Sequence, residues 1–199
     1  MSSVFDLLAE QFGGDSIGQI SRQIGADEDS TSRAISGALP MMMAALTRNA
    51  QTPDGAASLF NALERDHDGS LLDDLGGFLG QAETGSGDAI LGHVFGNRRS
   101  SVENGLSKMS GLDLGSIGKL LPILAPILLA ALGRKRSSRG FDPGGLTDML
   151  NTERRQAERS APREFSMLES FLDRDGDGQV IDDVASIATS VLGNLFRPR

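Results

Sequence analysis

Apolar residues recur every three or four positions along most of this chain, which is the spacing of helices that bury one face. The first two stripes cover residues 4–12 and 17–24 and are separated by a pair of glycines. Three later stripes cover residues 59–63, 165–172 and 184–195. No segment of useful length alternates apolar and polar residues as a half-buried strand would. The pattern therefore predicts an all-α fold.

Some helix starts can be placed from single residues. Ser30 is in position to cap a helix, while Pro40 and Pro126 suit the first turn of a helix, where a missing N–H costs little. The most apolar stretch, residues 120–132, contains two prolines and is shorter than the roughly 20 residues that span a bilayer. We expect a pair of buried helices there rather than a membrane span.

The sequence repeats itself at an offset of 86 residues. At this offset PMMMAALTR, residues 40–48, aligns with PILLAALGR, residues 126–134. Asp27 aligns with Asp113 in the same register. Agreement over separate segments at one offset indicates duplication of a whole structural unit rather than chance similarity.

The repeat predicts a tandem duplication of a short-helix bundle. Unit one covers about residues 3–80 and unit two about residues 88–196. Unit two is longer, and its extra residues include the polar segment 133–145, GRKRSSRGFDPGG. This segment is expected to be a flexible, basic and glycine-rich loop.

Each unit contains one copy of an unusual acidic segment. Loop one, residues 64–75, reads ERDHDGSLLDDL, and loop two, residues 173–184, reads DRDGDGQVIDDV. Each copy holds five carboxylates and one arginine, so the two together account for the whole formal net charge of −8. So much like charge in a short turn is unfavourable unless a cation lies among the oxygens, and hard divalent cations prefer oxygen ligands.

The start of both loops follows the EF-hand-like template D-x-[DN]-x-[DN]-G, in which oxygens at positions 1, 3 and 5 precede a turn glycine between two helices. Loop two matches this start completely, whereas loop one has a glutamate at position 1. Position 12, normally a bidentate glutamate, is apolar in both loops, and aspartates at positions 10 and 11 are left to close the site. The expected metal ligands are Glu64, Asp66, Asp68, Ser70, Asp73 and Asp74 in loop one and Asp173, Asp175, Asp177, Gln179, Asp182 and Asp183 in loop two.

Calcium is the expected ion at both sites, with Mg²⁺ or Mn²⁺ as alternatives. The affinity should be lower than that of a sensor EF-hand because the bidentate glutamate is missing. Loop two should bind more tightly, since a glutamate is long for the crowded first position of loop one. The alternative is that each loop is an acidic turn followed by an acidic helix start, which the helix dipole favours without any ion.

The sequence contains no clear set of catalytic residues. The chain has no cysteine and only two histidines, His67 and His93, which are interpreted as a solvent-facing loop residue and a core residue. No phosphate-binding glycine loop and no set of nucleophile, base and orienting residue is found. We therefore expect a non-enzymatic protein in which the cations act as structural staples or as a weak assembly switch. A homo-oligomer is compatible with the many glycines and alanines.

Two other functions stay open. Residues 20–35 resemble a DNA-binding helix-turn-helix with Arg33 on its second helix, and the basic residues 134–139 would assist such a function. The acidic residues 27–29, however, would repel a phosphate backbone, so no nucleic-acid partner is expected. The other alternative is an envelope-associated protein that docks through residues 120–136. Residues 1–14 lack the basic and apolar regions of a signal peptide, which favours a cytoplasmic protein.

A family resemblance rests on four parts of the chain. These are ISRQIGADEDSTSRAISGALP, LERDHDGSLLDDLGGFLG, ILGHVFGNRRSSVENGLSKMSGLDLG with LAPILLAALGR, and FLDRDGDGQVIDDVASIATSVLG. Together they resemble domain-of-unknown-function family 937, which includes YidB-like bacterial proteins, over nearly the full length. The resemblance implies an all-helical, cytoplasmic bacterial protein and supplies no established activity or partner.

Overall fold

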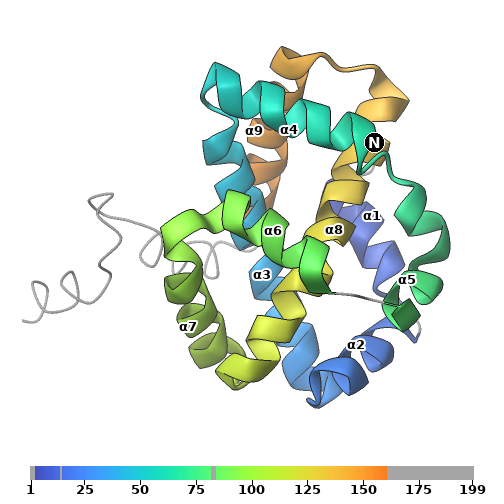
Figure 1. Ribbon diagram of the computed structural model, residues 1–199, viewed down its shortest axis with the longest axis vertical. Coiled ribbons are helices and arrows are strands. Elements are labelled where there is room, and N and C mark those ends of the chain that lie inside the picture. Colours follow the sequence, from blue (N-terminus) through green and yellow to red (C-terminus); the bar gives the residue numbers. More distant parts are fainter. Residues whose placement is uncertain (1–2, 14, 82–83, 161–199) are drawn as a thin grey trace, which may run out of the picture.

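The structure, a computed structural model, describes residues 3–13, 15–81 and 84–160, and these residues fold into helices without any strand (Figure 1). The prediction of an all-α fold is confirmed. In chain order the elements are α1 (Val4–Gln11), α2 (Ser16–Ile24), α3 (Glu28–Asn49), α4 (Pro53–Arg65), the 3-10 turn η1 (Ser70–Asp74), α5 (Leu75–Gln81), α6 (Thr84–Phe95), the 3-10 turn η2 (Gly96–Arg98), α7 (Arg99–Ser110), α8 (Leu114–Arg139) and α9 (Pro143–Ser160).

The two longest helices, α3 and α8, begin in the same way. The side chain of Asp27 accepts a hydrogen bond from the backbone N–H of Ser30 at 2.8 Å, and that of Asp113 accepts one from Ser116 at 3.0 Å. In both cases the preceding helix ends two residues earlier at a glycine in the left-handed conformation, with φ of 76° and 82°. The residue that caps α3 is therefore Asp27 and not Ser30 as expected. Its carboxylate also interacts favourably with the positive end of the helix dipole.

Prolines lie inside both long helices rather than in their first turns. Pro40 lies within α3, while Pro122 and Pro126 lie within α8, which continues unbroken through them. A proline inside a helix costs about 3 kcal/mol, because it removes a hydrogen bond and crowds the preceding turn. Burial of the apolar side chains around these prolines offsets that cost. The stretch 120–132 is thus part of one helix and not a pair of helices.

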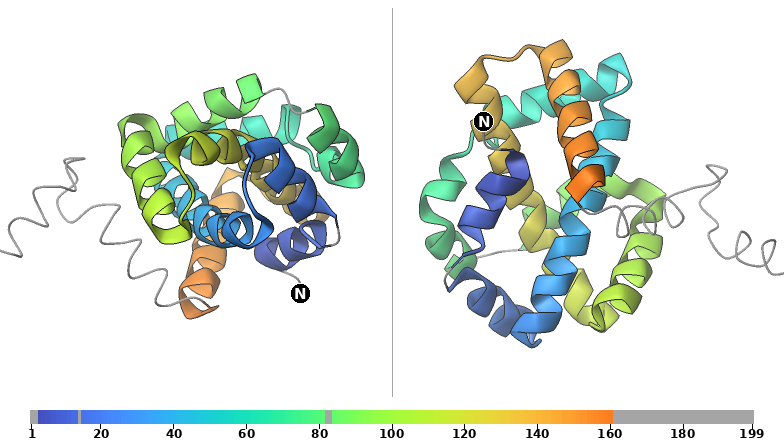
Figure 2. Two further views of the ribbon diagram at one scale, coloured as in Figure 1. Left: turned by 90° about the horizontal axis from the view of Figure 1, so that it is seen from below. Right: turned by 180° about the vertical axis from the view of Figure 1, so that it is seen from behind.

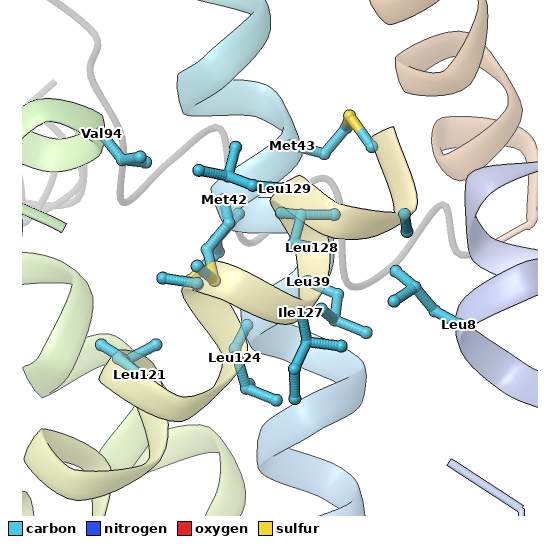
Figure 3. Packing of buried hydrophobic residues seen from close by; sticks show 14 of the residues in the cluster. Leu8, Leu39, Met42, Met43, Val94, Leu121, Leu124, Ile127, Leu128 and Leu129 are labelled. Atoms are coloured by element: carbon cyan, nitrogen blue, oxygen red, sulfur yellow. The ribbon is translucent and has the colours of Figure 1, made fainter. Parts of the chain in front are cut away.

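Helix α8 forms the centre of the hydrophobic core. All of its residues from Leu120 to Gly133 are buried, and Figure 3 shows its side chains beside Met42 and Met43 of α3 and Leu8 of α1. By length and composition α8 could span a bilayer, but 78% of its most apolar window is buried inside the protein. A helix that is apolar on every side is what the centre of such a core requires.

Helices from the two halves of the chain pack on one another rather than forming separate bundles (Figure 2). Helices α1 and α4 of the first half contact α8, while α6, α7 and α9 of the second half contact α3. Buried side chains from Val4 to Leu150 form a single cluster. Over the part of the chain that the structure describes, the expected units 3–80 and 88–196 therefore share one core.

The basic segment at the end of α8 differs from the expected flexible loop over residues 133–145. Residues 133–139 continue the helix, which ends at Gly140 with a φ of 63°. Helix α9 then begins at Pro143. Two basic side chains of this segment, Arg134 and Arg136, have partners elsewhere in the fold.

Candidate functional site

Loop one lies against the last turns of α8, and two glycines permit this close approach. A Cβ atom on Gly133 would lie 1.7 Å from the carbonyl oxygen of His67. A Cβ atom on Gly69 would lie 2.6 Å from Cβ of Arg134, and Gly69 has a φ of 105°, which side chains disfavour. Loop one and the end of α8 are thus in backbone contact.

Two arginines of the basic segment supply positive charge to loop one. Nη2 of Arg134 donates to the carbonyl oxygen of Gly69 at 2.7 Å and to Oδ1 of Asp73 at 2.5 Å. Nη1 of Arg136 lies 3.5 Å from Oε1 of Glu64. The Arg136 guanidinium also lies 4.9 Å from the centre of the Phe60 ring, a cation–π contact. The protein itself therefore neutralises part of the acidic cluster.

Two other loop-one carboxylates bind backbone N–H groups. Asp68 Oδ1 accepts from the N–H of Ser70 at 2.9 Å, and this bond is the largest cause of the lowered pKa of Asp68. Asp74 Oδ1 accepts from the N–H of Gly77 at 2.8 Å, in the first turn of α5. These acids therefore point toward separate donors, and in the described residues no three acidic or histidine side chains form a group that could hold a metal.

The expected ligands of loop two, residues 173–184, lie outside the described residues. The part of the candidate site that the structure describes consists of loop one and a neighbouring cleft.

This cleft, here named the α3–α4–α6 cleft, has a volume of about 710 Å³. Its floor is apolar, and Leu46, Val94 and Leu129 in it are each 4% exposed. Its polar lining includes Arg48 and the acidic residue Asp66. The full lining is Leu46, Arg48, Asn49, Thr52, Gly55, Ser58, Leu59, Ala62, Asp66, His67, Ala89, Ile90, His93, Val94 and Leu129.

Both histidines of the chain line this cleft, although no pattern in the sequence indicated that they would meet. His67, expected to face solvent, is half-buried, and this burial lowers its pKa from 6.5 against the opposing effect of the Asp66 carboxylate. His93, expected in the core, is exposed at the end of α6. Its backbone is held in place, because Asn49 Nδ2 donates to the carbonyl oxygens of His93 and Val94 at 3.0 and 3.2 Å.

A family model described as "Bacterial protein of unknown function (DUF937)" matches residues 6–135. The chain belongs to this family. No curated protein and no solved structure matches the chain. The matched DUF937 region extends from α1 to the last turns of α8, so it includes loop one and every residue that lines the cleft. Helix α9 and loop two follow this region.

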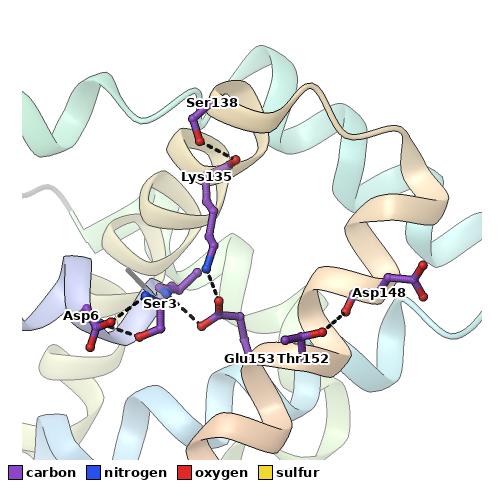
Figure 4. A network of polar contacts seen from close by, with 8 residues as sticks. Ser3, Asp6, Lys135, Ser138, Asp148, Thr152 and Glu153 are labelled. Atoms are coloured by element: carbon purple, nitrogen blue, oxygen red, sulfur yellow. Dashed lines mark hydrogen bonds and ion pairs between the residues drawn. The ribbon is translucent and has the colours of Figure 1, made fainter. Parts of the chain in front are cut away.

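The last matched residue of the DUF937 region, Lys135, joins it to α9 through a buried ion pair (Figure 4). Lys135 Nζ bonds Oε1 of Glu153, and the two side chains are 8% and 3% exposed. Oε2 of Glu153 accepts the N–H of Val4 at 2.8 Å, so the same carboxylate also holds the start of α1. The signal in the sequence was the position of Glu153, which continues the helical stripe of Leu146, Met149 and Leu150, three buried residues of α9.

Arg33, the residue that a DNA-binding hairpin would use, binds within the DUF937 fold. Its Nη2 donates to Oγ of Ser30 at 2.7 Å, and its Nε and Nη2 lie 3.4 Å from the carbonyl oxygen of Ser110. Arg33 thus satisfies the C-terminal end of α7 and ties it to α3, which is a sufficient structural role for this arginine.

Proposed function

We propose that this DUF937 protein is a non-enzymatic binder of divalent cations, calcium foremost, and that its two acidic loops fasten helices together by charge neutralisation. Loop two is the principal ion site, because Asp173, Asp175 and Asp177 match the calcium-loop template completely. Loop one binds an ion more weakly, because Glu64 and Asp73 are already paired with arginines.

The observation that carries this proposal is the double contact of Arg134 with loop one. One guanidinium binds both the Gly69 carbonyl and the Asp73 carboxylate, at the equivalents of positions 6 and 10 of a calcium loop. The positive charge of Arg134 therefore holds loop one to α8 through these two positions. An ion in loop two would supply positive charge to the corresponding turn, where Asp182 occupies the position of Asp73 and the expected carbonyl ligand is Gln179, one residue after Gly178.

The proposal includes the internal duplication, and several matched features support it. The order of α1 to α4 corresponds to that of α6 to α9. Helices α3 and α8 have aspartate caps 86 residues apart, follow left-handed glycines and contain aligned prolines. Helices α4 and α9 both begin at a proline, Pro53 and Pro143, and each packs on the long helix of the other half. One acidic loop follows each of these helices in the sequence.

Thermal unfolding of metal-stripped protein in EDTA, Mg²⁺ or Ca²⁺ tests the proposal. A ligand at about 100 times its Kd stabilises by about 2.7 kcal/mol if it binds only the folded state, and each kcal/mol raises the Tm of a chain of this size by about 2–4 °C. Asp177→Asn should remove most of the calcium effect and Asp68→Asn a smaller part. Glu10→Gln, an exposed acid outside both loops, is the matched control. Equal melting curves in calcium and EDTA would leave the loops as acidic turns without an ion.

A further inference from the structure

We propose that the α3–α4–α6 cleft is a binding site for a small apolar monocarboxylate, such as a medium-chain fatty acid, whose carboxylate pairs with Arg48. Arg48 and the apolar lining are not ion ligands of the acidic loops, whereas the rim residue Asp66 is an expected ligand of loop one, and the site goes beyond the proposed function.

The shape and lining of the cleft suit a ligand with an apolar body. The volume of about 710 Å³ falls within the range of about 300–1,000 Å³ that is usual for small-molecule pockets. Buried leucine and valine side chains form the floor, and half-buried Leu59 and Ile90 form two of the walls. A hydrocarbon chain that covers these groups would remove apolar surface from water on both sides of the contact.

Arg48 supplies the polar anchor. It lies in the last turn of α3, is half-buried and lines the cleft. In the internal alignment Arg48 corresponds to Arg134, whose guanidinium binds a carboxylate and a carbonyl oxygen of loop one. Within the described ranges the guanidinium of Arg48 has no such partner. The guanidinium of Arg48 is therefore available to the carboxylate of a ligand, as that of Arg134 is to the carboxylate of Asp73.

The other charged groups around the cleft favour a single negative charge. Asp66 is exposed at the rim and would repel a dianion such as a phosphate monoester. Solvent screens the attraction of the exposed Asp66 carboxylate for a cationic ligand. It screens the charge of the half-buried Arg48 less. His67 is half-buried in the lining and adds a neighbouring hydrogen-bonding side chain.

Isothermal titration of the full chain with decanoate, below its micellar concentration and in EDTA, tests the site. Saturable binding of one decanoate per chain is expected. Arg48→Gln should weaken it about tenfold or more, the loss expected for a hydrogen bond to a charged group. Arg22→Gln, which removes an exposed arginine from the last turn of α2, should leave the affinity unchanged. Decanol, which keeps the chain and lacks the charge, should bind wild type and Arg48→Gln equally and weakly.

One further variant and a folding control keep the result interpretable. Val94→Phe should fill the floor of the cleft and reduce decanoate affinity while leaving Arg48 in place, and melting curves check that each variant is folded. Absence of saturable decanoate binding to the wild type would overturn the proposal. So would equal affinity of the wild type and a folded Arg48→Gln.

One competing occupant is the acidic loop two of the same chain. Because the chain has no cysteine, the pair Arg48→Cys with Asp182→Cys can be oxidised without background, and Arg134→Cys with Asp73→Cys serves as the positive control. A disulfide that forms readily at the first pair and blocks decanoate would assign the cleft to the chain itself and overturn the proposal. A disulfide at the control pair alone supports a cleft open to the ligand.

Discussion

Glu153 of α9 and Lys135 of α8 form an ion pair that is buried on both sides. Glu153 also accepts the N–H of Val4, so three helices meet at one carboxylate (Figure 4). A buried charge is tolerated only where it is paired and its remaining hydrogen-bonding capacity is used. This contact joins α9, which follows the region matched to the family, to α8 and to the start of α1.

Removal of one partner of this pair should be costly. Glu153→Gln removes the negative charge that Glu153 supplies to the buried Lys135 ammonium and should lower the free energy of unfolding by about 3–5 kcal/mol. Urea denaturation measures the change, with Asp148→Asn, an exposed acid on the same helix, as the control. Replacement of both partners, Lys135→Met with Glu153→Leu, should recover most of the loss. A Glu153→Gln protein as stable as the control would contradict the buried pair.

Loop one should detach from α8 when Arg134 is neutralised. Asp73 is 72% exposed, so its ion pair contributes little by itself, and most of the expected loss of about 1–2 kcal/mol comes from the Gly69 carbonyl. Hydrogen exchange of residues 68–74 in Arg134→Gln, compared with Arg22→Gln, measures the release. Unchanged protection of these amides would mean that the glycine contacts alone hold the loop.

Gly133 and Gly118 of α8 should respond to alanine in opposite directions. Gly133→Ala places a methyl group 1.7 Å from the His67 carbonyl oxygen and should destabilise by about 1–3 kcal/mol, as overpacking does. Gly118→Ala, with nothing within 4 Å of the new Cβ, should stabilise the helix by about 0.5–1 kcal/mol. Midpoints of urea unfolding give both values. Two changes of the same sign would contradict the close approach of loop one.

Acid should weaken the starts of both long helices. The Ser30 N–H holds the pKa of Asp27 below its ordinary value of 3.8, and hydrogen bonds from the Ser116 side chain and N–H do the same for Asp113. A depressed folded-state pKa gives stability that is present above the ordinary value and is lost as pH falls through the folded value. Asn at both positions keeps the cap but does not titrate. The double variant should therefore lose less stability than the wild type between about pH 4 and pH 2, and equal slopes would contradict this.

Local pattern was sufficient for the helices and insufficient for their partners. The 3.6-residue period predicted the helical class, and the repeated acidic segment located loop one. The prolines of α3 and α8 misled the prediction of helix starts, because their cost is local and the burial that offsets it depends on the whole fold. The segment 133–139 had the composition of a loop, yet Arg134 and Lys135 find partners 61 and 18 residues away.

The two histidines illustrate the same limit. His67 and His93 line one cleft only because α4 and α6 both pack near the end of α3, which no spacing in the sequence predicts. A signal for the arginine contacts did exist, since acidic loop one and the basic residues 134–139 have opposite charge. Opposite charge indicates compatibility and does not by itself identify a contact.

Calorimetric titration of metal-free protein with calcium tests the central proposal most directly. We expect saturable binding, with a tighter site that Asp177→Asn removes and a weaker site that Asp68→Asn removes, while Glu10→Gln binds as the wild type does. The proposal would be contradicted if the wild type gave only heats of dilution. It would also be contradicted if binding survived in the Asp68→Asn and Asp177→Asn double variant.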